Sequence, residues 1–535
     1  MNSWSDTLNP LMTLETFSTG AAIEENLQQF LIVLLVSLSV ATLSQSLDWF
    51  RKIPYTLLLV IVGLGLAFVD VRLVNLSPQL ILLIFLPPLV FEAAWNLEWS
   101  HLKRDLVPIN LYAILGVVIS IAGVALALNQ LAGITMATAL LVGASVSATD
   151  PVSVIALFRE LGVEKRLSTL MEGESLFNDG IAVVAFGFLV GLSFGGDQFS
   201  LPILVARFFS FVGIAVGVGS LIGFGISFLT QRFDLPMVEQ SSTLVAAYGS
   251  YIIAENLGGS GVIAVVITGL ILGNFGSRIG MNPRTRLIVT EFWNFLAFFV
   301  NSIVFLLIGD QIRFATVIDN LWPIAVLIGA VILTRAIAIF GLGGLSNWVA
   351  KSEIPLPEQL VLWWGGLRGS VSIALALSLA LALPEREEAI ALVFGVVLFT
   401  LLVQGLTTKP LLDKLGLLGK QALRQEYREA IARRTALNRV LTQLSQDTIR
   451  QAVEPEYHHH IVTRVKEQLD HIQEEIKQLH DEYPDLQEFT INQLQKDMLA
   501  IESDTYAEFI RVGRLSEFPS PLLLEVFQDK DEKTV

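Results

Sequence analysis

Long apolar runs constrain the fold of this chain more than any other feature of its sequence. Stretches of about 18 or more apolar residues, each long enough to cross the hydrocarbon core of a bilayer, recur between Gln29 and Leu412. Only 16% of the 535 residues are charged, whereas about a quarter are charged in a soluble globular protein. We therefore expect an all-α, polytopic membrane protein.

Breaks in the apolar part predict about thirteen membrane spans. They are charged residues or runs rich in Gly, Pro and Asn, and they leave spans near 29–47, 55–70, 79–97, 107–130, 134–158, 175–195, 201–230, 238–256, 261–275, 289–309, 321–347, 357–383 and 388–412. Twelve Lys and Arg residues fall on one set of alternate connections and three on the other. This asymmetry predicts a cytoplasmic C-terminus and an N-terminus on the outer side.

The two ends of the chain differ in composition from the apolar part. Residues 1–28 hold acids but no Lys or Arg, unlike a signal peptide, so we expect them to stay as an extracytoplasmic N-terminus. Residues 29–412 form the predicted transmembrane domain, and residues 413–535 are too rich in charge to cross. This tail is predicted to be cytoplasmic and regulatory, with helices over about 421–450 and 458–482, where apolar residues recur at threes and fours.

Ionisable side chains inside the spans are functional candidates, because a charge in the middle of a bilayer is costly. Six of them stand inside the apolar runs: Glu92, Asp150, Glu174, Asp179, Arg335 and Arg368. Four other acids lie nearer span ends and are interpreted as solvated or interfacial groups: Glu239, Glu255, Glu291 and Asp310. Arg335 lies mid-span and needs a carboxylate partner, for which Asp150 and Glu174 are both candidates.

The fifth predicted span contains a helix breaker, in the run Ser147-Ala148-Thr149-Asp150-Pro151. Proline disfavours the α conformation at the residue before it and fits the first position of a helix, while Thr and Asp are good N-caps. We therefore expect one helix to stop and another to start inside the bilayer, with the freed carbonyl of Thr149 available to a cation. The alternative is a simple proline kink that leaves Asp150 near the surface.

The sixth predicted span begins with a run of oxygen-bearing side chains. Glu174 and Asn178 are four residues apart, as are Ser175 and Asp179, so the four share one side of a helix. Carboxylates, a hydroxyl and a carbonyl suit a hard cation rather than a soft metal. Proton and cation would compete for Asp179, and exchange is obligatory if the empty, charged site cannot cross. The alternative is an amphipathic helix start with both acids solvated.

The twelfth predicted span holds a second break. Gly365, Gly366 and Gly369 weaken the helix around Arg368, so a second unwound helix is expected there. Interruptions in the fifth and the twelfth span are what an inverted-topology repeat of about six spans would produce. Corresponding interruptions in two halves point to the site of transport.

Four motifs together resemble the first family of monovalent cation:proton antiporters, which includes the NhaP-type proteins of bacteria and archaea and the eukaryotic sodium/proton exchangers. They are LPPLVFEAAW, GASVSATDPVSVIALFRELG, GESLFNDGIAVVAF and GGLRGSVSIALAL. The resemblance covers most of residues 29–412 and leaves out the tail. It implies a transporter rather than an enzyme, without cofactor, that exchanges Na+ and also Li+ for H+ across the plasma (inner) membrane in pH homeostasis and salt tolerance.

The resemblance also implies an architecture of thirteen spans with two crossed, unwound helices, and a homodimer in which a core domain moves against a dimer-interface domain. Carried over by motif, the ion-binding aspartate falls on Asp179 and its partner on Asn178. The remaining ligands of Na+ would be Glu174, Ser175 and the carbonyl of Thr149.

Four further charged residues receive supporting roles from the same resemblance or from their place in the spans. Asp150 would be an auxiliary acid beside the helix break at Pro151. Arg335, Arg368 and Glu92 would be structural, charge-pairing groups. Asparagine rather than aspartate at the position before the ion-binding acid resembles the electroneutral branch of the family, which implies one cation per proton.

Other classes of membrane protein fit the sequence less well. The run 258–261 matches the GxSG of a rhomboid-like protease, but all six histidines lie outside the predicted spans, so the base is missing. A channel would not need a titratable carboxylate beside a broken helix. A K+/H+ or Ca2+/H+ antiporter of the same architecture stays open, because side-chain identity does not fix the cavity size that selects a cation. The net charge of −15 indicates no partner, and we expect no nucleic acid.

Overall fold

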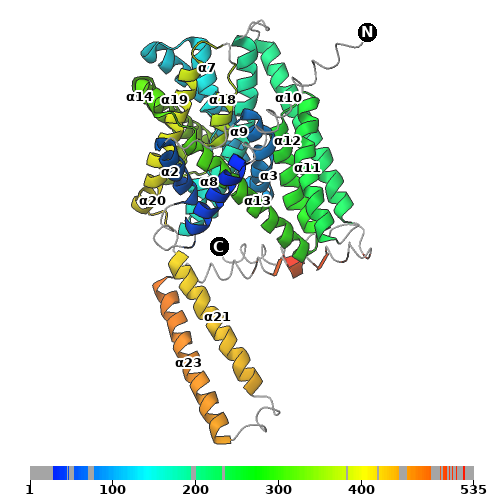
Figure 1. The fold of residues 1–535 in the computed structure, drawn as a ribbon. Helices are drawn as coiled ribbons and strands as arrows, with labels where there is room; N and C mark the ends of the chain where they lie inside the picture. The colour runs from blue at the N-terminus through cyan, green and yellow to red at the C-terminus, as the bar shows by residue number, and fades with distance from the viewer. Residues whose placement is uncertain are drawn as a thin grey trace, which may run out of the picture. The chain divides into compact units, whose positions relative to one another are not determined.

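The computed structural model describes residues 28–44, 46, 54–69, 77–193, 201–231, 235–380, 383–418, 421–444 and 455–483, and scattered positions between 495 and 523. Throughout this described part the regular elements are helices, which confirms the predicted all-α class (Figure 1). The chain separates by internal packing into two units, residues 1–417 and 418–535. The predicted N-terminal segment 1–28 lies almost entirely outside the described residues.

The helices of the first unit follow one another with short connections. After a helix at Gln28–Ser44 they are α2 (Tyr55–Phe68), η2 (Leu80–Phe85), α3 (Leu86–Asn96), α4 (Trp99–Leu102), α5 (Leu106–Asn110), η3 (Leu111–Gly116), α6 (Val117–Ala127), η4 (Leu128–Ala132), α7 (Met136–Ser145), α8 (Val152–Leu161), α9 (Lys165–Ser193), α10 (Leu201–Thr230), α11 (Pro236–Asn256), α12 (Gly261–Ile271), η5 (Leu272–Gly280), α13 (Pro283–Asp310), α14 (Phe314–Asp319), α15 (Leu321–Ala336), η6 (Ile337–Gly341), α16 (Leu342–Ala350), α17 (Leu356–Trp364), α18 (Ser370–Leu377), α19 (Arg386–Phe399), η7 (Thr400–Gln404) and α20 (Gly405–Lys414). The η segments are π-helical turns, most of them set within longer helices.

Six helices of the described part are long and apolar enough to cross a membrane. They are Leu106–Ala132, Lys165–Leu192, Val205–Thr230, Arg284–Asp310, Leu321–Ala350 and Arg386–Lys414. Shorter apolar helices lie between them, and two of the predicted spans are split into shorter pieces. The count of about thirteen spans therefore stays a prediction.

The sixth predicted span begins earlier in the structure than in the sequence prediction. We placed its start near residue 175, whereas α9 begins at Lys165. Charged residues marked that boundary, but Arg166 forms an ion pair with Asp105 at 2.9 Å and so can be part of the helix. As a result the run Glu174–Asp179 lies inside a long helix and not at a solvated helix start.

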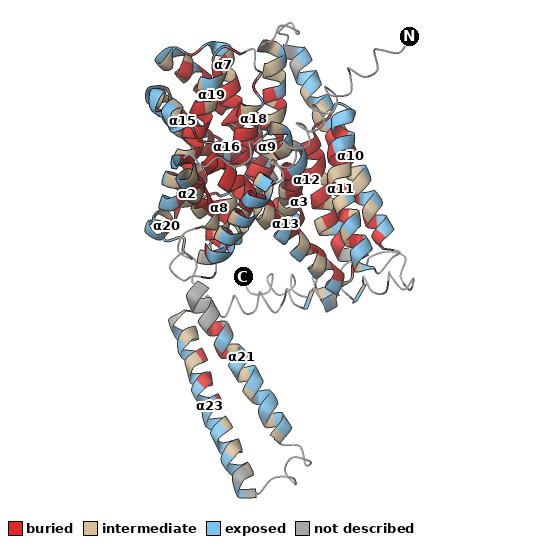
Figure 2. Ribbon diagram, in the orientation of Figure 1, coloured by how far each residue is buried: buried red, intermediate tan, exposed pale blue. Residues whose placement is uncertain are grey.

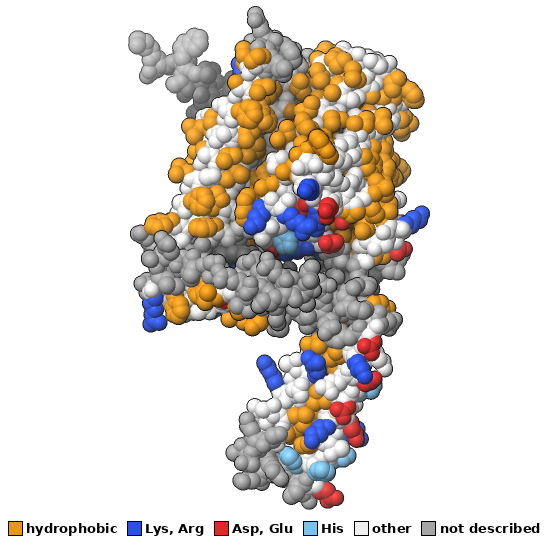
Figure 3. Space-filling view, turned by 180° about the vertical axis from the view of Figure 1, so that it is seen from behind, with side chains coloured by type: hydrophobic (Ala, Val, Ile, Leu, Met, Phe, Trp, Pro, Cys, Tyr) orange, Lys and Arg blue, Asp and Glu red, His pale blue; other side chains and the backbone are white. Residues whose placement is uncertain are grey.

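The outward faces of the first unit are apolar. Phe209 and Leu221 on α10 are 68% and 77% exposed, and the outer sides of α10 and α11 are largely exposed in Figure 2. Figure 3 shows hydrophobic side chains over most of one face of this unit, with charged side chains gathered toward one end. A contiguous apolar surface of this kind is where lipid tails are expected.

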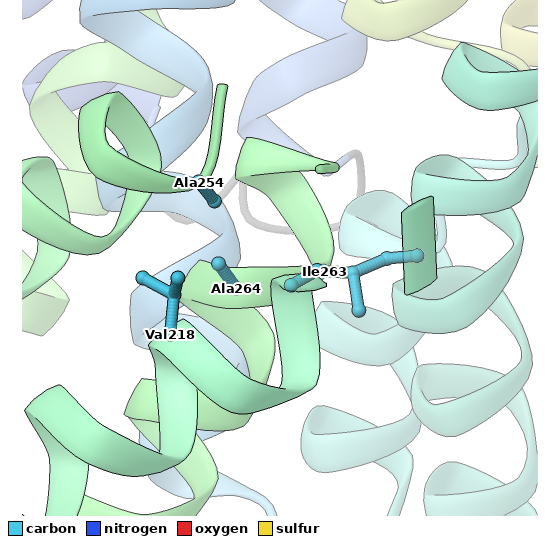
Figure 4. Close-up of a cluster of buried hydrophobic side chains, with 5 residues drawn as sticks. Val218, Ala254, Ile263 and Ala264 are labelled. Atoms are coloured by element: carbon cyan, nitrogen blue, oxygen red, sulfur yellow. The ribbon is translucent and has the colours of Figure 1, made fainter. Parts of the chain in front are cut away.

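Small residues bring α10, α11 and α12 close together (Figure 4). Their buried cluster is made of Ala215, Val218, Ala254, Ile263 and Ala264. A Cβ on Gly219 would stand 2.6 Å from the carbonyl oxygen of Ala264, so glycine is required by the contact. Close backbone approach through small residues is how helices associate in lipid, where burial of apolar surface gives no driving force between them.

Two helices of the first unit are interrupted, and their interruptions touch. α7 ends at Ser145 and α8 begins at Val152, while α17 ends at Trp364 and α18 begins at Ser370. The backbone N–H of Asp150 in the first break donates to the carbonyl of Leu367 in the second at 2.8 Å. The two predicted unwound helices are therefore present and cross each other.

The second unit contains two helices that pack on each other, α21 (Gln421–Leu444) and α23 (Pro455–Glu482). Tyr427 and Ala430 of α21 are buried with Ile472 and Ile476 of α23. Both helices were predicted, and α23 begins three residues earlier than the predicted start at 458, while the predicted end of the first, 445–450, lies outside the described residues.

Candidate cation-binding site

A cavity of about 380 Å³ ends at the crossing of the two interrupted helices. Its walls come from α2, α3 and α13, and from the α7–α8 break, α8, α9 and α18. The charged residues of its lining are four acids and one arginine: Glu92, Asp150, Glu172, Asp179 and Arg159. An excess of carboxyl groups in a concave site with low-dielectric walls attracts cations.

Asp179 lies on α9 and lines this cavity. Its Oδ1 atom is buried and makes no hydrogen bond to any residue that the structure describes. Buried carboxylate oxygens in native proteins are almost always hydrogen-bonded or bound to a cation. The free oxygen at the end of an acidic cavity is thus a position that a proton or a hard cation can take.

Thr149 and α9 are joined by a layer of hydrogen bonds beside Asp179. Asn178 Nδ2 donates to Thr149 Oγ1 at 2.7 Å, and Asn178 Oδ1 accepts the backbone N–H of Thr149 at 3.2 Å. The hydroxyl of Ser175 donates to the carbonyl of Thr149. The predicted oxygens of Thr149, Ser175, Asn178 and Asp179 are therefore brought together at one place, the first three as members of this layer and the last beside it.

Glu174 lies on α9 and forms a buried ion pair with Arg335 of α15. Nη1 and Nη2 of Arg335 each donate to one carboxylate oxygen of Glu174 at 2.9 Å. Arg335 also donates to the carbonyls of Leu362 and Trp363, near the end of α17. Of the two partners predicted for Arg335, Glu174 is the one the structure selects. Glu174 is 3% exposed, so the interpretation of this acid as solvated is wrong.

Arg368 in the second break holds the backbone of the first. Its Nη1 donates to the carbonyls of Ser147 and Ala148 at 3.0 and 3.1 Å. These carbonyls follow the last turn of α7, where a helix concentrates partial negative charge and a cation is stabilising. The guanidinium therefore supplies a charged donor to two carbonyls that the helix break leaves without helical partners in the bilayer interior.

Two glycines of the second break are there because the crossing leaves no room for a side chain. A Cβ on Gly369 would overlap Asp150, and a Cβ on Gly366 would overlap the guanidinium of Arg335. From the sequence, these glycines were interpreted only as helix breakers. Their second role, close approach to the charged residues of other elements, depends on the fold.

Asp150 and Pro151 sit at the start of α8, and both line the cavity. Asp150 Oδ1 accepts the N–H of Val152 at 3.1 Å, which satisfies one of the free donors at the start of that helix. The chain leaves the helical conformation between α7 and α8 altogether, so the alternative of a simple proline kink is wrong. Asp150 belongs to the same cavity as Asp179.

Glu92 lies on α3 and also lines the cavity. Its Oε1 accepts a hydrogen bond from Asn96 Nδ2 at 2.6 Å. Glu172 of α9 approaches Arg159 of α8, with Nη2 of Arg159 3.5 Å from Oε1 of Glu172, and this pair also lines the cavity. The predicted charge-pairing role of Glu92 stays a prediction, since within the described residues its hydrogen-bond partner is an amide.

Two acids that the sequence assigned to span ends are buried. Glu239 is 1% exposed and Asp310 is fully buried, so the interpretation of these two as solvated is wrong. Glu255 and Glu291 are exposed, as expected for residues near span ends. Apolar runs alone do not show which side of a helix end faces a neighbouring helix.

Several residues at the crossing gave no signal in the sequence. Thr400 Oγ1 accepts the backbone N–H of Arg368 at 3.0 Å, and Ser372 Oγ donates to the carbonyl of Ala148 at 3.3 Å. Tyr55 and Asn301 line the cavity from α2 and α13. Single hydroxyl and amide groups are common in apolar helices, so only the fold distinguishes these from the rest.

The chain is similar to known proteins over most of its length. The family model described as "Sodium/hydrogen exchanger, transmembrane" matches residues 29–414. The Na(+)/H(+) antiporter ApNhaP of Aphanothece halophytica is 59% identical over 96% of this chain and 99% of its own length. The low-affinity Na(+)/H(+) antiporter NhaS1 of Synechocystis sp. is 58% identical over 94% of this chain and 96% of its own.

A solved structure supports the same fold. The sodium proton antiporter MjNhaP1 from Methanocaldococcus jannaschii, at pH 8, superposes with a TM-score of 0.60 over 74% of this chain and 99% of that chain. The two sequences are 21% identical, so this likeness concerns the fold alone.

Proposed function

Because the chain belongs to the transmembrane sodium/hydrogen exchanger family, we propose that it is a secondary antiporter that exchanges Na+, and also Li+, for H+. Two relatives of similar length are both named Na(+)/H(+) antiporters. The observation that carries the proposal is Asp179, whose buried Oδ1 has no described hydrogen-bond partner and which lines a cavity rich in carboxyl groups. The chain is a transporter, and its substrates are the two ions.

Competition for Asp179 couples the two ions in this proposal. A proton and a sodium ion each neutralise the carboxylate, and neither can bind while the other is present. The empty site keeps a negative charge, which is costly to move through a poorly hydrated region. The charge of Glu174 is balanced by Arg335, and residue 178 is an asparagine. One group then changes its charge with loading, which gives one Na+ per H+.

We propose Asp179, Ser175 and the carbonyl of Thr149 as direct ligands of Na+. The Ser175 hydroxyl already contacts that carbonyl, so the two oxygens are close to each other. Glu174, the further ligand implied by the resemblance, is not among the residues that line the cavity of Asp179, and both of its carboxylate oxygens accept hydrogen bonds from Arg335. We therefore propose it as a supporting residue of the site rather than as a direct ligand. Asn178 would hold Thr149 in place, and Asp150 would act as an auxiliary acid in the same cavity.

The cellular setting follows from charge and from the family. We infer a homodimer in the plasma (inner) membrane, with residues 1–28 outside, a transport domain over 29–412 and a regulatory tail over 413–535 in the cytoplasm. The cavity reaches the exposed Arg159, which lies on the basic connection predicted to be cytoplasmic. The cavity would therefore face the cytoplasm in this conformation. Its role would be pH homeostasis and tolerance of salt.

Everted membrane vesicles test this function. A respiratory pH gradient is formed, and Na+, Li+, K+ and Ca2+ are added in turn while the gradient is followed with a fluorescent amine. We expect Na+ and Li+ to dissipate the gradient and K+ and Ca2+ to leave it. A response to K+ or Ca2+ alone would move the assignment to a K+/H+ or Ca2+/H+ antiporter. A rate that changes with an imposed membrane potential would overturn the one-to-one exchange.

A further inference from the structure

A second, much smaller cavity lies on the other side of the hydrogen-bonded layer from Asp179. It measures about 20 Å³, and the polar residues that line it are Tyr112, Ser120, Ser147, Glu174, Asn178, Arg335 and Arg368. All seven are buried, each with 9% exposure or less. Asn178 lines the small cavity while its neighbour Asp179 lines the large one. The two cavities therefore meet different faces of α9 at this point.

Three buried polar groups around the small cavity are unsatisfied. Tyr112 Oη, Ser120 Oγ and Arg368 Nε make no hydrogen bond to a residue that the structure describes. An unpaired buried polar group costs about 1–3 kcal/mol, so three in one place require a common explanation. Each of the three residues lines this same cavity.

The backbone around the cavity is also irregular. Tyr112 lies in η3 and Ile339 in η6, two π-helical turns that pack on each other. Both residues line the cavity. π-helical turns inside α-helices are rare and often mark functional sites. Gly343 leaves space for the tyrosine, since a Cβ there would stand 2.8 Å from its hydroxyl.

We propose that this small cavity holds one ordered water molecule, which accepts the Nε–H of Arg368 and hydrogen-bonds to the hydroxyls of Tyr112 and Ser120. A cavity needs about 10–15 Å³ and two to four polar partners to hold one water molecule, and this one offers both. The charged lining is two arginines and one glutamate. Such a lining repels Na+, so the small cavity is not a second cation site.

The water makes Tyr112 and Ser120 positioning residues for the cation site. Arg368 holds the carbonyls of Ser147 and Ala148, the two residues before Thr149. A guanidinium fixed at Nε as well as at Nη1 keeps this backbone, and with it the proposed carbonyl ligand, in one place. Loss of the water should weaken cation binding more than it slows turnover. This consequence rests on the proposed function, whereas the presence of the water does not.

X-ray radiolytic labelling of the full chain in lipid nanodiscs tests for the water directly, because ordered water activated by the beam oxidises the side chains it touches. The matched pair of variants is Gly116→Ala and Gly329→Ala. Gly116 lines the cavity, and a Cβ there would stand 3.8 Å from Ala338 Cβ, so it fits and takes up space. A Cβ on Gly329 meets nothing within 4 Å and lies in α15 away from the lining.

We expect rapid oxidation of Tyr112 in the wild type and in Gly329→Ala, and a severalfold slower rate in Gly116→Ala. Equal rates at Tyr112 in all three proteins would overturn the proposal. In vesicles, Tyr112→Phe and Ser120→Ala should each raise the apparent KM for Na+ about fivefold, because each removes one hydrogen bond and a single hydrogen bond changes an equilibrium by about that factor. The maximal rate should stay nearly unchanged. A fall in maximal rate at constant KM would overturn the positioning role.

Replacing chloride with gluconate in the assay buffer distinguishes a bound water molecule from a bound anion in the small cavity. A KM for Na+ that depends on chloride would overturn the assignment of water. If the chain exchanged no cation at all, the proposed function would fail, but the labelling result would still decide whether water is present.

Discussion

The two interrupted helices meet at one crossing and carry opposite charges. The break between α7 and α8 contributes Asp150, which lines the large cavity with Asp179. The break between α17 and α18 contributes Arg368, which donates to two carbonyls of the other break and lines the small cavity. The first break presents oxygens to a cation. The second break supplies the positive charge and the hydrogen-bond donors that stabilise the backbone carbonyls of the first break in the bilayer interior.

This division explains why irregular backbone survives in the membrane interior. Freed backbone groups there must be satisfied by protein or line a wet cavity. The Asp150 N–H is satisfied by Leu367 and the carbonyls of Ser147 and Ala148 by Arg368. Because the two breaks differ in this way, substitutions in the second should mainly reduce stability, and substitutions in the first should mainly reduce transport.

Replacing Arg368 should have the largest effect on folding. In Arg368→Leu, two buried carbonyls lose a charged donor, at about 1.5–3 kcal/mol for each bond. We expect the thermal midpoint in detergent, measured by fluorescence-detected size exclusion, to fall by many degrees or the protein to be lost. The control is Arg159→Leu, whose side chain is largely exposed. Equal midpoints for the two variants would contradict the structural role of Arg368.

Adding one methyl group at the crossing should cause the second-largest loss of stability. In Gly369→Ala the new Cβ overlaps Asp150, and overpacking of this kind costs about 1–3 kcal/mol. Gly344→Ala, where a Cβ meets nothing within 4 Å, is the control. The same thermal assay should separate them clearly. If Gly369→Ala had the same thermal midpoint as the control, Gly369 and Asp150 would not be in close contact.

Asp150→Asn should show the opposite pattern from Arg368→Leu. The amide oxygen can still accept the N–H of Val152, so the midpoint should stay within a few degrees of wild type. The loss of a carboxyl group from the cavity should raise the KM for Na+ about tenfold, equivalent to about 1.4 kcal/mol. Sodium titrations in everted vesicles measure this KM. An unfolded Asp150→Asn protein would show that the first break is structural too.

Thr400→Val should have the smallest effect. It removes one acceptor, which the N–H of Arg368 uses at 3.0 Å, and one neutral hydrogen bond is worth about 1 kcal/mol. We expect a midpoint a few degrees lower and an unchanged KM for Na+. A raised KM would mean that the backbone of the second break also sets cation affinity.

The sequence was sufficient to find both breaks, because proline and clustered glycines act on the local backbone. It was not sufficient to choose between Asp150 and Glu174 as the partner of Arg335, since that depends on which side of α9 faces α15. It placed the start of α9 about ten residues late. The cause was the charged stretch from Lys165 to Glu174, whose partners the sequence does not show; that of Arg166, for example, is Asp105, 2.9 Å away in the fold but distant along the chain.

The small cavity was beyond prediction for a related reason. Tyr112 and Ser120 lie on one continuous helix, Leu106–Ala132, and Arg368 lies far from them along the chain, in the second break. Arg368 stood out in the sequence as a charge inside an apolar run, but a single tyrosine and a single serine in an apolar helix did not. They meet only where the helix Leu106–Ala132 and the second break line the same cavity. Residues whose role is set by backbone preference can be read from sequence, whereas residues whose role is set by apposition of distant helices cannot.

The central claim is that proton and sodium compete for Asp179, and one measurement tests it directly. Everted vesicles with the wild type or with Asp179→Asn form a pH gradient, Na+ is added, and the release of protons is followed at equal protein level and equal thermal midpoint. We predict no sodium-dependent release from Asp179→Asn, because the amide cannot exchange a proton for a cation. Undiminished release from a folded Asp179→Asn protein would contradict the account.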